Sequence, residues 1–118
     1  MADAALFIGW GTPVRGREQK ALEVFNESMA YWGQLQASGA IDSVEVYLLT
    51  PHGGDLNGFA ILKGDQSKLM EVERSEEFQR NLARANLIVE NLGIVHANTG
   101  QGLANQMALF SAQIGELA

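Results

Sequence analysis

The feature that most constrains the fold is a turn-forming stretch in the middle of the chain. Residues 51–56 read Pro-His-Gly-Gly-Asp-Leu and separate two apolar runs, at residues 45–50 and 58–63. Proline, glycine and aspartate favour the backbone conformations that a chain reversal requires. Two strand-forming runs joined by such a stretch predict a β-hairpin, so the centre of this chain is expected to be a pair of antiparallel strands.

The segments around this hairpin also have regular patterns. Residues 4–10 form a short, continuous apolar run that is typical of a strand buried on both faces. From residue 17 to 38, apolar residues recur three, four and seven positions apart, which predicts an amphipathic helix that ends at Gly39. Residues 43–50 alternate between apolar and polar, as a half-buried strand does.

The second half of the chain repeats the order of helix and strand. A helical pattern follows Gly64, with a break expected at Ser75, because a serine followed by two glutamates is typical of a new helix start. Residues 94–98 predict the last strand. A final helix over residues 102–117 then carries one apolar stripe, made of Leu103, Met107, Phe110, Ile114 and Leu117.

The predicted order is strand, helix, strand, strand, helix, strand, which is the α+β arrangement called ferredoxin-like. Right-handed crossovers place the strands in the order 4-1-3-2 in an antiparallel sheet, with both helices on one face. The runs 4–10 and 58–63 are nevertheless apolar on both faces. Something must therefore cover the second face of the sheet.

A second copy of the sheet would provide that cover, and over about residues 4–100 the chain resembles the dimeric α+β-barrel superfamily. Residues 75–80 and 91–95 are similar to the second helix and last strand of its uncharacterised bacterial members. The resemblance implies a homodimeric barrel. It also implies a range of functions, among them cofactor-free monooxygenases, lactone isomerases, haem-handling enzymes and ligand-binding or structural members.

The final helix has two predicted places in such a dimer. It could cover the open face of its own sheet, or it could embrace the partner subunit. In either arrangement its stripe, including Leu103, Met107, Phe110 and Ile114, is interpreted as core or interface rather than as a cofactor site.

Composition narrows the class of protein. A chain of 118 residues is expected to form one domain, residues 1–118. A net charge of −6 argues against nucleic acid and anionic membrane surfaces as partners. The lack of cysteine excludes disulfides and a thiolate zinc site. Without a basic leader or an apolar run of membrane-spanning length, a cytoplasmic protein is expected. We also expect no cofactor and no metal.

The candidate catalytic residues are His96, Tyr47 and Glu45. If Val95 and Ala97 face the helices, His96 lies on the same side of the sheet as the other two. A histidine, a phenol and a carboxylate around an apolar cavity could remove a proton from a carbon acid and stabilise the oxyanion. The alternative is a hydrogen-bonded strand histidine at the dimer interface.

A ligand pocket is expected at the edge where the first two strands end, because their loops converge there. Trp10, Arg15 and His52 would lie at its mouth, with Tyr47, His96 and Asn98 inside the barrel. Each of the first three has a structural alternative: Trp10 in the core, Arg15 in a solvated loop and His52 as a turn residue.

Two weaker motifs lie in the same region. His52 and Asp55 could hold a metal weakly, but two ligands do not make a site. The G-x4-G spacing from Gly11 to Gly16 follows a strand, yet Arg17 and Glu18 stand where a phosphate loop needs Lys and Ser or Thr.

The sequence as a whole favours a homodimer that binds or converts a small, partly apolar molecule in a barrel cavity, without metal or nucleotide. The alternative is a non-catalytic ligand-binding or assembly module.

Overall fold

The computed structural model describes residues 2–118 and contains one antiparallel sheet in the order β2-β3-β1-β4. The strands are β1 (Ala4–Trp10), β2 (Ser43–Leu48), β3 (Gly58–Gly64) and β4 (Gly93–Asn98). The central hairpin is confirmed, since β2 and β3 pair antiparallel across the loop of residues 49–57. The predicted sheet order 4-1-3-2 is confirmed as well.

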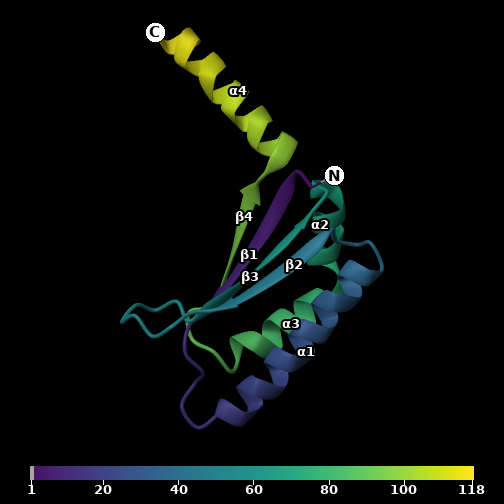
Figure 1. The fold of residues 1–118 in the computed structure, drawn as a ribbon, viewed down its shortest axis with the longest axis vertical. Helices are drawn as coiled ribbons and strands as arrows, with labels where there is room; N and C mark the ends of the chain where they lie inside the picture. Colours follow the sequence, from purple (N-terminus) through teal and green to yellow (C-terminus); the bar gives the residue numbers. More distant parts are fainter. Residues whose placement is uncertain (1) are drawn as a thin grey trace.

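Three helices cover one face of this sheet: α1 (Glu18–Ala37), α2 (Gln66–Arg74) and α3 (Glu76–Asn86) (Figure 1). The break predicted at Ser75 is confirmed. Its hydroxyl oxygen accepts a hydrogen bond from the Phe78 backbone N–H (3.2 Å), which caps the start of α3. Asp65 caps α2 in the same way through the Lys68 backbone N–H.

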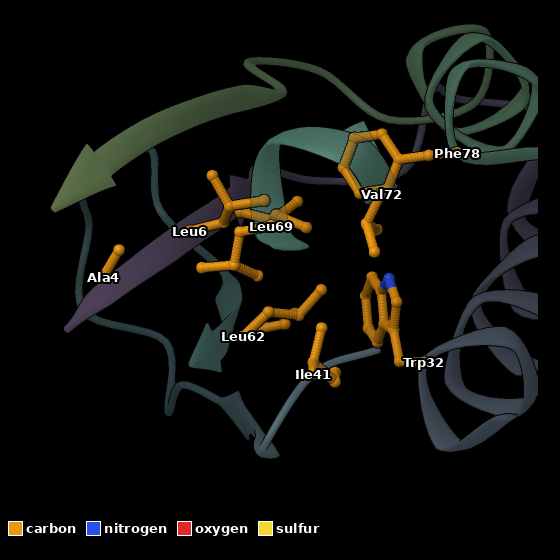
Figure 2. Close-up of a cluster of buried hydrophobic side chains, with 10 residues drawn as sticks. Ala4, Leu6, Trp32, Ile41, Leu62, Leu69, Val72 and Phe78 are labelled. Carbon is orange, nitrogen blue, oxygen red and sulfur yellow. The ribbon is translucent and has the colours of Figure 1, made fainter. Parts of the chain in front are cut away.

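The core lies between the sheet and these helices. Alternate strand residues such as Leu6 and Leu62 point toward the helices and are almost completely buried. Side chains from all three helices meet them, including Trp32, Leu69 and Phe78 (Figure 2). Burial of this apolar surface is the main term that stabilises the folded chain.

The opposite face of the sheet has no helix over it. Phe59 lies at its centre, and its ring stacks on the rings of Phe7 and Tyr47, with centroids 5.0 Å apart in both pairs. Ile61 and Val95 share this face, because each pairs with Phe7 in the strand register. The sheet thus presents a row of aromatic and aliphatic side chains that no part of residues 2–118 covers.

The last helix, α4 (Gly100–Leu117), extends beyond the end of β4 and away from the other helices (Figure 1). None of its residues is buried. The extension makes the radius of gyration 16.5 Å, whereas a compact domain of this length has about 13.5 Å. The alternative in which the final helix covers its own sheet is therefore wrong. None of the described helices has the length and apolar character needed to cross a membrane.

Candidate functional site

A cavity of about 620 Å³ lies between the sheet, α1 and α3. It occupies the end of the sheet where β1 finishes and the hairpin loop begins, and its wall is mainly apolar. Trp10 forms part of this wall, with its ring packed edge-on against Phe25 of α1 (centroids 5.8 Å apart). A volume of this size fits a small organic molecule.

Backbone hydrogen bonds hold the surrounding loops together. The Asn57 N–H donates to the Trp10 carbonyl (2.8 Å), and the Gly11 N–H donates to the Glu90 carbonyl (2.7 Å). A Cβ atom at Gly11 would lie 2.8 Å from that Glu90 oxygen and 2.9 Å from the Asp55 oxygen, so only glycine fits. The end of β1, the hairpin and the loop before β4 thus converge, as the topology predicted.

Ser28, Trp32 and Asn81 are among the polar side chains in this mainly apolar wall. The Asn81 amide donates to the Ser28 hydroxyl oxygen (2.8 Å), and that hydroxyl donates to the Val24 carbonyl (2.7 Å). Trp32 is only 3% exposed, and within residues 2–118 its indole N–H has no hydrogen-bond partner. A buried donor without an acceptor is destabilising, and such groups are rare in folded proteins.

The predicted grouping of His96 with Tyr47 and Glu45 is wrong. His96 pairs with Leu6 in the strand register, and Leu6 faces the helices. Val95 rather than His96 lies on the uncovered face with Tyr47 and Glu45, because strand residues alternate between faces. The premise that Val95 and Ala97 face the helices does not hold.

The carboxylate beside His96 belongs to Glu73 of α2. The His96 Nε2 atom lies 2.8 and 3.1 Å from the two carboxylate oxygens of Glu73. Both residues, together with Asn98, line a second hollow of about 570 Å³ at the opposite end of the sheet from the Trp10 cavity. A histidine oriented by a carboxylate can accept and release a proton.

Tyr47 and Glu45 form a separate pair on the uncovered face. The Tyr47 hydroxyl donates a hydrogen bond to the Glu45 carboxylate. This hydrogen bond, together with the negative charge of Glu45, raises the pKa of Tyr47. The phenol therefore stays protonated at neutral pH, and its proton is engaged in the hydrogen bond to Glu45.

The remaining predicted pocket residues lie outside the cavity wall. In the hairpin loop, the His52 Nδ1 atom accepts from the Gly54 N–H (3.2 Å) and Nε2 lies 2.7 Å from the Leu56 carbonyl. Both ring nitrogens thus interact with backbone atoms of the same loop. Arg15 is exposed in the turn before α1. Within residues 2–118, no three His, Cys, Asp or Glu side chains come together as a metal site would require.

Sequence reasoning did not single out Ser28 and Asn81. The available signal was a polar residue on the apolar face of each helix. Ser28 lies one helical turn after Val24 and one before Trp32, and both of these are buried. Asn81 lies one turn after the buried Phe78.

Comparisons with known proteins place the fold among solved structures. No family model and no curated sequence matches this chain. A dimeric protein of unknown function with a ferredoxin-like fold, from Bacteroides fragilis, is 15% identical with a TM-score of 0.60, covering 81% of this chain and 96% of that one. An ethyl tert-butyl ether d (EthD) family protein from Bacillus halodurans is 12% identical with a TM-score of 0.63, covering 85% and 100%.

An enzyme is also among the similar structures. A variant of SnoaB, a cofactor-independent oxygenase from Streptomyces nogalater, is 14% identical with a TM-score of 0.56, covering 84% of this chain and 93% of that one. Identities this low establish the fold alone. The predicted resemblance is thus confirmed for the subunit architecture, and the sheet order and these likenesses together show that this chain has the ferredoxin-like fold.

Proposed function

We propose that this protein binds a small, mainly apolar molecule in the cavity between the sheet, α1 and α3. The observation that carries the proposal is a mainly apolar cavity of about 620 Å³ lined by Trp32, whose buried indole N–H has no hydrogen-bond partner among residues 2–118. A ligand with one hydrogen-bond acceptor would satisfy this donor, while its apolar body would replace water along the wall. The nearby Ser28–Asn81 pair supplies a second polar contact.

The cavity size argues for binding over a purely structural role. Small-molecule pockets have volumes of about 300 Å³ or more. An assembly module that binds no ligand does not need a cavity of that size. Among the similar structures, an oxygenase that needs no cofactor shares this fold. The proposed ligand site likewise uses no metal and no nucleotide.

The test uses the two tryptophans, because both line the cavity and the chain has no others. A panel of one- to three-ring ketones and phenols is titrated while tryptophan fluorescence is recorded. We expect saturable quenching by at least one compound. Substitution Ala85→Met places extra side-chain volume in the cavity wall and should weaken that binding about 10-fold or more.

The matched control is Ala83→Met, an exposed alanine on the same helix, two residues away. It introduces the same side chain outside the cavity wall and should leave binding unchanged. Equal affinities for the two variants would contradict the proposed site. The melting temperature of each variant shows that both remain folded.

We also propose that the protein is a homodimer whose two uncovered sheet faces pack together. Phe7, Phe59 and Tyr47 form a stacked aromatic row on that face, and exposed apolar surface of this kind marks an interface. The similar protein from Bacteroides fragilis is described as dimeric. Light scattering at micromolar concentration should report the mass of two chains, and the mass of one chain would contradict the pairing.

A second candidate function is proton transfer at His96, with Glu73 rather than Glu45 as the carboxylate that orients it. The 2.8 Å contact between them, at the wall of a separate hollow, favours this pair. If His96 is a general base, His96→Gln should lower turnover of a carbon-acid substrate by about 100-fold or more. Unchanged turnover would end this assignment.

A further inference from the structure

The apolar stripe of α4 has the spacing of a helix–helix seam. Leu103, Met107, Phe110, Ile114 and Leu117 follow one another at intervals of four, three, four and three residues. This is the a/d pattern of a coiled coil, in which every member faces the same neighbouring helix. Each of these side chains is between 50 and 86% exposed in the subunit.

The start of α4 is fixed against the body of the subunit. The Thr99 N–H donates to the Asp3 carbonyl (3.1 Å), next to β1. A Cβ atom at Gly102 would lie 2.1 Å from the same Asp3 oxygen, and one at Gly100 would lie 2.5 Å from the Ala2 oxygen. Both glycines thus allow a close backbone approach that sets the direction in which the helix leaves the sheet. The stripe is thus held away from the hydrophobic core of its own chain.

The charge of α4 limits what can cover it. Glu116 is its one charged side chain, and the chain as a whole carries −6. Nucleic acid and anionic lipid both need basic side chains, which this helix lacks. An uncharged apolar seam can pair with its own copy, because two copies can approach without repulsion between like charges.

We propose that the α4 stripe packs against α4 of a second copy of this chain. The inference rests on the proposed homodimer only in needing a second copy, since the seam uses different residues from the sheet face. The seam residues all belong to α4, which follows the four-stranded sheet and the three helices on its face. The second copy would then be held at two places, the sheet and the helix.

The first test places a charge in the seam of the full chain. In Phe110→Asp a carboxylate would be buried in each half of the seam, and the dimer dissociation constant should rise about 100-fold or more. The matched control is Ala112→Asp, which puts the same residue on the opposite side of the same helix. It should leave the dissociation constant unchanged within about threefold.

Folding of the subunit can be separated from assembly. Because no residue of α4 is buried in the subunit, the Phe110→Asp chain should keep the circular dichroism of the folded sheet and helices. A folded Phe110→Asp chain that dimerises as tightly as the control would overturn the seam. Ligand binding in the Trp10 cavity is read out separately by fluorescence, so its failure would leave this inference standing.

The second test uses the absence of cysteine from the natural sequence. A two-fold axis passes through the contact between two identical helices, so at least one seam position must lie close to its own copy. Single variants Met107→Cys, Phe110→Cys and Ile114→Cys are oxidised in parallel with Ala112→Cys. At least one seam variant should form disulfide-linked dimers far faster than the control. Equal, slow oxidation of all four would overturn a helix–helix seam.

Discussion

At the scale of single residues, hydrogen bonds decide what the polar side chains do. His52 has both ring nitrogens occupied by its own loop, and Tyr47 donates to Glu45. Trp32 differs, because its buried N–H has no acceptor within residues 2–118. A buried donor without an acceptor needs an explanation, and a ligand in the proposed cavity would supply one.

Asp65 provides a prediction about pH. Its carboxylate accepts from the Ser67 hydroxyl (2.6 Å) and the Lys68 N–H (3.2 Å), and these bonds lower the pKa of Asp65 below its ordinary value of 3.8. The resulting stabilisation is present above that ordinary pKa, which the unfolded chain has, and is lost as pH falls through the lower pKa of the folded state. Asparagine at this position keeps an acceptor but does not titrate.

The measurement compares melting temperatures of the natural chain and Asp65→Asn between pH 6 and pH 2. The natural chain should melt higher at pH 6, and its advantage should shrink toward pH 2. Asp55→Asn, in the hairpin loop and away from any helix start, is the control. Parallel melting curves for the natural chain and Asp65→Asn across this range would contradict the assigned role.

At the scale of elements, caps and alternation account for the helices and strands. Ser75 ends α2 and begins α3, donating to the Val72 carbonyl (2.6 Å) and accepting from the Phe78 N–H (3.2 Å). The serine therefore fixes a break in what would otherwise read as one long helix. This break directs Phe78 into the core and Asn81 toward the cavity.

Removing the Ser75 cap gives a prediction about stability. Ser75→Ala loses the acceptor for the Phe78 N–H, and the free energy of unfolding should fall by about 1 kcal/mol. Chemical denaturation measures the change, with Ser111→Ala on the exposed helix α4 as the control. A loss no larger than that of the control would show that packing alone positions α3.

At the scale of the whole molecule, two apolar surfaces are left without cover, the sheet face and the α4 stripe. Both are consequences of how the elements are arranged, since α1, α2 and α3 all lie on the other face (Figure 1). A subunit with these surfaces exposed to water would be prone to association. The proposed pairing with a second copy would remove both from solvent.

Phe59 gives the prediction for the sheet face. Its ring stacks between Phe7 and Tyr47, so a charge introduced there would lie at the centre of the paired sheets. Phe59→Asp should shift the equilibrium from the dimer toward folded monomers, measured by light scattering together with circular dichroism. Thr50→Asp, at an exposed position beyond the end of β2, is the control. A Phe59→Asp chain that dimerises as tightly as the Thr50→Asp control would place the interface elsewhere.

Local patterns in the sequence were sufficient to predict the elements and their topology. Period-two and period-3.6 patterns, the turn at residues 51–56, Ser75 and the positive-φ Gly39 are local signals, and all correspond to features of the structure. The convergence of Trp10 with the hairpin also followed, because sheet order fixes which loops share an edge.

Which residues of each strand face the helices was harder to predict from the sequence. For the short strand β4, exposed on both faces, alternation alone gives two assignments, and the sequence reading chose the wrong one for His96. The register with β1 decides the matter. His96 pairs with Leu6, which faces the helices, so His96 also faces them and lies next to Glu73.

The sequence by itself therefore determined the ferredoxin-like order of elements, the break at Ser75 and the need for a second layer over the sheet. These depend on local conformational preference and on alternation, which neighbouring residues encode. The tertiary structure alone decided the partner of His96, the lack of an acceptor among residues 2–118 for the buried N–H of Trp32, and the outward direction of α4. These depend on contacts between segments far apart in the chain, such as Gly102 against Asp3, which no local pattern records.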